Sequence, residues 1–164
     1  MSIKYKFIGK SLRLPETRYI YYLRFFKMNK ILIVDDEINI GLILSKFLVR
    51  NGFEVNTATN GAAAFDYLSK DFYNLVLCDF RLEDTDGREI LRKIKENYPE
   101  TGVIIITGYS DIKLAVELIK MGAFDYITKP FSPRELVARV RAILRRRGGP
   151  SGDAVIRVGS LEVD

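Results

Sequence analysis

The chain has 164 residues, of which 48% are hydrophobic and 29% charged, a balance typical of a globular protein with one domain of ordinary size. It contains no histidine, which excludes Ser-His-Asp and Cys-His catalysis and most zinc sites within this chain. The single cysteine, Cys78, excludes an internal disulfide and favours a reducing compartment, so we expect a cytoplasmic protein. No stretch approaches the ~20 consecutive apolar residues of a membrane span.

The net charge of +5 is concentrated at the N-terminus, because residues 1–27 hold seven basic residues and one acid. The remainder is close to neutral, so the charge does not predict a general nucleic-acid binder. Residues 19–26 of this segment are mostly aromatic and apolar. One interpretation is an amphipathic surface or membrane anchor. We favour a poorly ordered extension without membrane contact, ahead of a domain that spans residues 28–147.

Five strands are predicted after this extension. Continuous apolar runs at 31–34, 75–78 and 103–106 indicate strands that are buried on both faces. The runs at 53–58 and 125–128 are shorter or more polar and indicate strands near the edges of a sheet.

A helix pattern follows each predicted strand. The first helix places Ile40, Ile43, Leu44, Phe47 and Leu48 on one inward stripe. The next has an inward face at 64–68, and further helices span 88–97 and 112–121. The last begins at Pro133, behind a capping box at Ser132.

Alternating strands and helices predict an α/β fold with right-handed crossovers. With the most apolar strands at its centre, the sheet is a doubly wound, flavodoxin-like (βα)5 sheet of strand order 2-1-3-4-5. Residues 148–153 are rich in glycine and indicate a linker. Residues 154–164 contain two strand-like runs and are expected to begin an output domain that is cut off.

Polar side chains follow the predicted strands at one edge of the sheet. Asp35 and Asp36 follow the first strand, and Asp79, Thr107 and Lys129 follow the third, fourth and fifth. Three neighbouring carboxylates require a cation, and oxygen ligands favour Mg²⁺. A metal, a lysine and a hydroxyl around one carboxylate suit a phosphoryl group on Asp79, since carboxylates form aspartyl-phosphates.

The motifs ILIVDDE, LCDFRLEDTDG, IIITG and FDYITKPF resemble the CheY-like receiver domain of bacterial two-component response regulators, over roughly residues 29–147. The body of the chain resembles receivers that precede ATPase transcription activators, the NtrC type. The end, FSPRELVARVRAILRRR with VIRVGSLEVD, resembles receivers that precede a winged-helix DNA-binding domain, the OmpR/PhoB type. Natural variation and a junction between two sources near Phe131 both remain open.

The resemblance implies a role for each of these residues. Asp36, Asp79 and the Arg81 backbone carbonyl would bind Mg²⁺, with Asp35 supporting the ion through water. Asp79 would take a phosphoryl group from the phosphohistidine of a sensor histidine kinase. Lys129 would then pair with the phosphate.

A conformational switch is also implied. Thr107 would turn toward the phosphoryl group, Tyr126 would rotate inward, and the Lys129–Pro130 bond would be cis. The changed face, formed by the helix 112–121, the strand 125–128 and the helix from Pro133, would form a homodimer. Arg81 and Tyr109 occupy the positions that tune phosphoryl lifetime in the family. Many receivers have Met-Pro after the phosphoacceptor, whereas this chain has Leu82-Glu83, and the missing proline favours a looser loop.

Two alternative functions are considered beside the receiver domain. A phosphatase that forms a transient aspartyl-phosphate would need a second acid two residues after its nucleophile, and Arg81 stands there. An unphosphorylated, receiver-like interaction module would not need the complete set of acids. We therefore expect a signalling domain rather than an enzyme, which contacts DNA only through the missing output domain.

Overall fold

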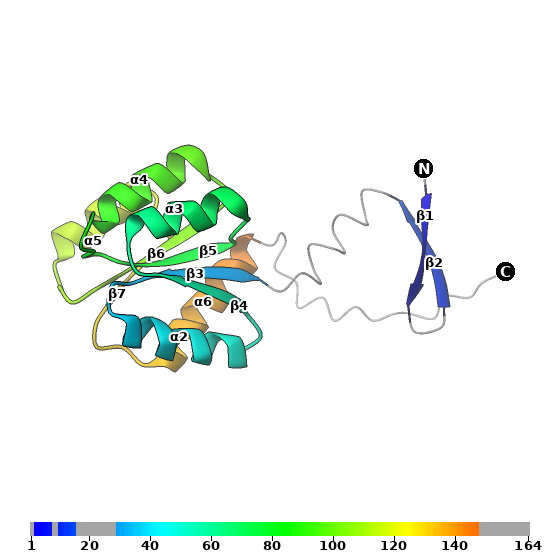
Figure 1. The fold of residues 1–164 in the computed structure, drawn as a ribbon, viewed down its shortest axis with the longest axis horizontal. Coiled ribbons are helices and arrows are strands. Elements are labelled where there is room, and N and C mark those ends of the chain that lie inside the picture. Colours follow the sequence, from blue (N-terminus) through cyan, green and yellow to red (C-terminus); the bar gives the residue numbers. More distant parts are fainter. Residues whose placement is uncertain (1, 8–9, 16–28, 148–164) are drawn as a thin grey trace.

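The computed structural model describes residues 2–7, 10–15 and 29–147 (Figure 1). The strands β1 (Ser2–Phe7) and β2 (Lys10–Pro15) pair antiparallel, with Ile3 opposite Leu14. This hairpin differs from the poorly ordered extension that we expected. Apolar and polar residues alternate at positions 3–7, a pattern that favours a strand. The aromatic run 19–26, the linker 148–153 and the segment 154–164 lie outside the described residues.

Five parallel strands form the central sheet of residues 29–147. Their order is β4-β3-β5-β6-β7, which confirms the predicted order 2-1-3-4-5. Every residue of β5 and β6 is buried, as expected for central strands covered on both faces. The bounds are β3 (Lys30–Val34), β4 (Glu54–Ala58), β5 (Leu75–Asp79), β6 (Gly102–Thr107) and β7 (Asp125–Thr128).

Five helices cover the two faces of this sheet (Figure 1). Two of them, α2 (Ile38–Arg50) and α6 (Pro133–Arg147), pack on one face through Leu48 and Val140. The other face carries α3 (Gly61–Lys70), α4 (Gly87–Asn97) and α5 (Ile112–Lys120). None of the helices in this part of the chain is long and apolar enough to cross a membrane.

The predicted inward stripe of α2 is wrong at one position. Leu44 and Leu48 are buried, but Ile43 is 60% exposed. At 100° per residue Ile43 lies beyond the edge of the stripe that faces the sheet. It instead lines an open apolar pocket beside Pro130 and Phe131.

The loops at the carboxyl edge of the sheet are fixed by helix caps. Asp86 caps α4 by accepting from the Glu89 amide at 3.1 Å. Ser132 caps α6 in the same way, accepting from the Glu135 amide at 3.0 Å. Gly87 permits a close approach, because a Cβ there would lie 3.1 Å from the Cα of Phe80. The loop that follows Asp79 is thus held closely against the start of α4.

Candidate functional site

The structure brings the predicted site residues together at the carboxyl edge of the sheet. Asp35 follows β3, and Asp79 and Thr107 end β5 and β6. Lys129 follows β7. An open pocket of about 360 Å³ lies at this edge and is lined by Asp36, Glu37, Asp79, Arg81, Thr107, Gly108, Tyr109 and Lys129.

Three carboxylates lie close together at this edge of the sheet. One oxygen from each of Asp35, Asp36 and Asp79 lies within 4.8 Å of the others. Asp35 and Asp79 are only 4% and 8% exposed. Burial raises the pKa of Asp79 to about 6, and the charge of Asp35 adds to this effect against the opposing charge of Lys129. Burial raises the pKa of Asp35 as well.

Lys129 is the cation that the pocket residues share. Its Nζ lies 3.3 Å from Asp35 Oδ2, 3.4 Å from Asp79 Oδ1 and 3.5 Å from Glu37 Oε1. Burial lowers the pKa of Lys129, but the charges of Asp79 and Asp35 outweigh burial and the net pKa is raised. The Lys129 ammonium and the Arg81 guanidinium together do not balance the carboxylates of Asp35, Asp36, Glu37 and Asp79, so this edge keeps an excess of negative charge.

These carboxylates fit a bound divalent cation. Their donors are all oxygen atoms, which hard cations such as Mg²⁺ prefer. Asp36 is less buried than Asp35 and Asp79, so the site is open on one side. Arg81 lines the same pocket two residues after Asp79. A cation held here would balance the excess charge that Lys129 leaves.

Tyr109 links the remaining site residues. Its amide donates to Thr107 Oγ1 at 3.1 Å, and its carbonyl accepts from the hydroxyl of Tyr126. Its ring lies 4.3 Å from the guanidinium carbon of Arg81, a cation–π contact. The Lys129–Pro130 bond is cis, as the resemblance implied.

Two residues near the site were not singled out from the sequence. Glu37 contributes a third carboxylate to Lys129, and its place directly after Asp35 and Asp36 was the signal that could have identified it. Asp84, in the loop after Asp79, hydrogen-bonds to the start of α3. The sequence carries no signal for that contact, because its partners are backbone amides more than twenty positions away.

The fold and the site define a CheY-like α/β signalling domain, with an acidic pocket at the carboxyl edge of a flavodoxin-like sheet. Residues 31–141 match the family described as the response regulator receiver domain. The chain therefore belongs to this family, whose members act in two-component systems.

Similar proteins agree with this assignment. The chain is 39% identical over 143 residues to the transcriptional regulatory protein SrrA of Staphylococcus aureus, an alignment that covers 83% of this chain and 59% of the regulator. Among solved structures, a CheY-like receiver domain from Methanospirillum hungatei has a TM-score of 0.71 at 32% identity, covering 74% of this chain and 97% of that one. NtrX from Brucella abortus has a TM-score of 0.68 at 32% identity, covering 73% of this chain and 27% of that one.

Proposed function

We propose that Asp79 accepts a phosphoryl group from the phosphohistidine of a sensor histidine kinase in an Mg²⁺-dependent reaction. The observation that carries this proposal is the placement of Asp79. It is a buried carboxylate at the end of a central strand, with Lys129 Nζ 3.4 Å away and two further acids beside it. A phosphohistidine supplied by a partner also explains how a chain without histidine takes part in this chemistry.

In the proposed reaction a carboxylate oxygen of Asp79 attacks the phosphorus atom. The bond from phosphorus to the imidazole nitrogen breaks, and that nitrogen keeps the electron pair. Asp36, Asp79 and the Arg81 carbonyl would hold Mg²⁺, with Asp35 supporting it through water, and the bound ion would neutralise phosphoryl oxygens.

The lysine and threonine of the pocket stabilise the phosphorylated state. Lys129 pairs with one phosphoryl oxygen, exchanging part of its contact with Asp35 for the new charge. The Thr107 hydroxyl donates to another, and in doing so leaves its present contact with the Tyr109 amide.

This movement of Thr107 is the proposed start of the switch. Tyr126, whose hydroxyl donates to the Tyr109 carbonyl, follows into the space that the threonine leaves. The α5–β7–α6 face then changes its packing and pairs with a second phosphorylated copy. The transcriptional output, in the cytoplasm, runs through an output domain that would contact DNA, as the name of SrrA supports.

Arg81 and Tyr109 set the lifetime of the signal in this proposal. Both line the pocket, and their cation–π contact places a guanidinium and an aromatic ring beside Asp79. Together they hinder water from reaching the acyl phosphate. The chain then catalyses its own phosphorylation and slow dephosphorylation, without turnover of a separate substrate. A phosphatase remains disfavoured because Arg81 stands where its second acid would be needed.

The experiment that tests the proposal is intact mass spectrometry after incubation with phosphoramidate or acetyl phosphate and Mg²⁺. The wild type should gain one phosphoryl group, and Asp79→Asn should gain none. Asp66→Asn is the matched control, because it removes an exposed carboxylate on α3 that pairs with Lys70, and it should keep the adduct. An unmodified wild type, or an undiminished adduct on Asp79→Asn, would overturn the proposal. Steady release of phosphate from small esters would instead favour the phosphatase.

A further inference from the structure

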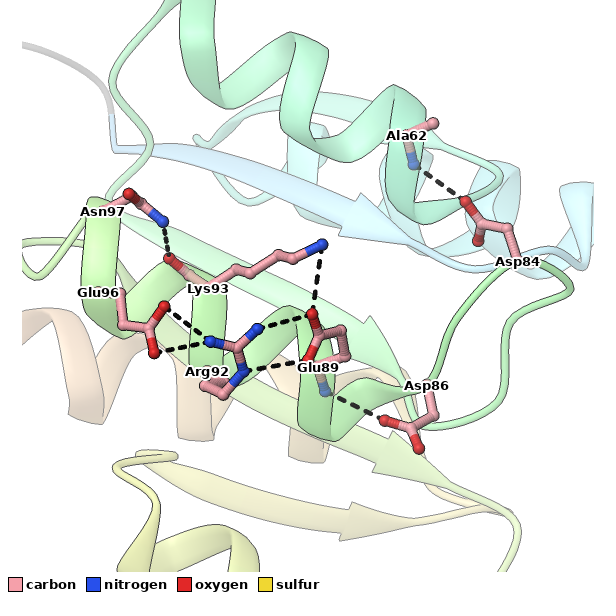
Figure 2. Close-up of polar contacts among 8 residues, drawn as sticks. All are labelled: Ala62, Asp84, Asp86, Glu89, Arg92, Lys93, Glu96 and Asn97. Carbon is pink, nitrogen blue, oxygen red and sulfur yellow. Dashed lines mark hydrogen bonds and ion pairs between the residues drawn. The ribbon is translucent and has the colours of Figure 1, made fainter.

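Asp84 fastens the loop between β5 and α4 to the first turn of α3. Its Oδ1 accepts from the Gly61 amide at 2.9 Å, and its Oδ2 accepts from the Ala62 amide at 3.1 Å. Figure 2 shows Asp84 reaching from the loop to Ala62 at the start of the helix above it. Amides in the first turn of a helix have no partner within the helix, so the loop supplies what α3 lacks.

Two neighbours show that this contact is built into the fold. The Asn60 side chain accepts from the Ala63 amide at 2.8 Å, so Asn60 and Asp84 together bind three successive amides of α3. A Cβ at Gly61 would lie 2.7 Å from Thr85 Cγ2, closer than real side chains approach. Glycine at position 61 therefore makes the room that the loop tip occupies.

The charge of Asp84 suits this place. The hydrogen bond from the Gly61 amide lowers the pKa of Asp84 below its ordinary value, and the hydrogen bond from the Ala62 amide adds a smaller effect in the same direction. The carboxylate also lies at the positive end of the α3 dipole. Asp84 consequently stays ionised and bonded over the whole neutral range.

The loop itself is narrow and closed at its base. The Gly87 amide donates to the Phe80 carbonyl at 2.8 Å, and Arg81 pairs with Asp86 in an antiparallel bridge. Arg81 thus belongs to the base of a loop whose tip Asp84 fastens to α3. Glu83 replaces the proline of many receivers, so the Asp84 contact supplies rigidity that the missing proline would otherwise give.

We infer that Asp84 is a positioning residue for the metal site, which holds the backbone of Arg81 where its carbonyl meets Mg²⁺. This inference rests on the proposed function, because it assumes that the Asp79 pocket binds the ion. Asp84 is not among the three carboxylates of the acidic cluster or the residues that line the pocket, so it acts only through the loop. Its loss should therefore weaken Mg²⁺ binding and leave those carboxylates chemically intact.

The test is an Mg²⁺ titration of the unphosphorylated full chain, followed by calorimetry or by amide NMR shifts. Asp84→Ala should raise the dissociation constant about tenfold, the size that supporting residues of metal sites typically contribute. Glu83→Gln is the matched charge control, since it removes one negative charge from the adjacent loop position. It should change the constant by less than about twofold, because exposed charges are screened. Hydrogen exchange at the Gly61 and Ala62 amides should speed up in Asp84→Ala alone.

Saturation with Mg²⁺ adds a second readout. The phosphorylation rate of Asp84→Ala from phosphoramidate should fall at low Mg²⁺ and return to that of the wild type when Mg²⁺ is saturating. Unchanged Mg²⁺ affinity together with faster amide exchange would overturn the inference and leave Asp84 as a helix cap only. Equal weakening in Glu83→Gln would also overturn it, by showing a charge effect. If Asp84→Ala does not fold, Asp84→Asn, which keeps one acceptor oxygen, is judged by the same two criteria.

These outcomes differ from a failure of the proposed function. In that case the wild type itself would show no Mg²⁺-dependent phosphorylation and Asp79→Asn would bind Mg²⁺ as the wild type does. A normal wild type beside an Asp84→Ala variant with unchanged Mg²⁺ affinity contradicts the positioning role alone.

Discussion

The two ends of the parallel sheet use the same chemistry, a lysine among carboxylates, with opposite electrostatic results. At the amino end, Lys30 Nζ lies 2.9 Å from Glu54 Oε1, also pairs with Asp71, and sits 5.3 Å from the centre of the Tyr73 ring. At the carboxyl end, Lys129 lies among the acids of the candidate site. Of the second set, Glu37, Asp79 and Lys129 line the pocket of the candidate site.

Burial of the acids makes the difference. The side chains of Glu54 and Asp71 are 48% and 43% exposed, so they neutralise Lys30 at little desolvation cost, and hydrogen bonds from Lys30 to Asp71 and then Glu54 raise the pKa of Lys30. Asp79 is buried beside another buried acid, and its pKa rises to about 6. The amino end is therefore arranged for stability, and the carboxyl end keeps an unbalanced charge that a ligand can relieve.

The largest expected difference between the two ends is in the phosphorylation rate after each lysine is replaced by methionine. Lys129→Met should slow phosphorylation of Asp79 by roughly 10²–10³-fold, the usual effect of removing one group that stabilises a developing charge. Lys30→Met should leave the phosphorylation rate of the folded protein unchanged, because Lys30 is at the opposite end of the sheet. Single-turnover kinetics with phosphoramidate at saturating Mg²⁺ would measure both. Similar losses for the two variants would remove the distinction between the ends.

Removing the charge of Asp79 should stabilise the protein when Mg²⁺ is absent. The pKa of Asp79 in the folded state is about 6, above its ordinary 3.8, so ionisation of this group opposes folding. The stability that protonated Asp79 contributes is fully present below about pH 4, and it is lost as the pH rises through about 6. Asp79→Asn should therefore raise the free energy of unfolding by on the order of 2–3 kcal/mol at pH 8, and by much less near pH 4.5.

Urea unfolding in EDTA at the two pH values would measure this gain. Asp66→Asn, which alters an exposed ion pair with Lys70, should give nearly no change at either pH. A loss of stability in Asp79→Asn at pH 8 would mean that the carboxyl end is not electrostatically strained.

Breaking the Lys30 contacts at the amino end should lower the free energy of unfolding, by less than the Asp79→Asn substitution raises it. Lys30→Met removes hydrogen bonds to Asp71 and Glu54, and since both acids remain hydrated the expected cost is about 1 kcal/mol. The same urea experiment should show this loss at pH 8. A stabilised variant would show that the two ends are not distinct.

The weakest predicted effect concerns the residues above the site. Arg81→Ala removes the cation–π contact with Tyr109, which is worth about 0.5–1 kcal/mol at an exposed position. The phosphorylated state should then lose its phosphoryl group a few times faster, a difference that phosphate release after removal of the donor would record. A matched variant, Arg92→Ala, alters only the exposed Glu89 and Glu96 ion pairs on α4 (Figure 2) and should leave the lifetime unchanged.

The sequence was sufficient for the order of the sheet and for the residues that meet at its carboxyl edge. Apolar runs identified the central strands, and the strand ends brought Asp35, Asp79 and Lys129 to one edge. Periodicity alone could not show that Ile43 lies outside the buried stripe, because the width of the contact with the sheet sets that boundary. The Asp84 contact could not be predicted from the sequence either. A side chain that binds distant backbone amides depends on the path of the loop, which the sequence does not show.

The central claim is that the strained acid at the carboxyl end, Asp79, takes the phosphoryl group. The most direct measurement treats the full chain with phosphoramidate and Mg²⁺, reduces the acyl phosphate with borohydride, and maps the reduced residue by peptide mass spectrometry. Reduction is expected at Asp79 alone, with none when Mg²⁺ is removed with EDTA. Reduction at a different carboxylate, or equal labelling without Mg²⁺, would contradict it.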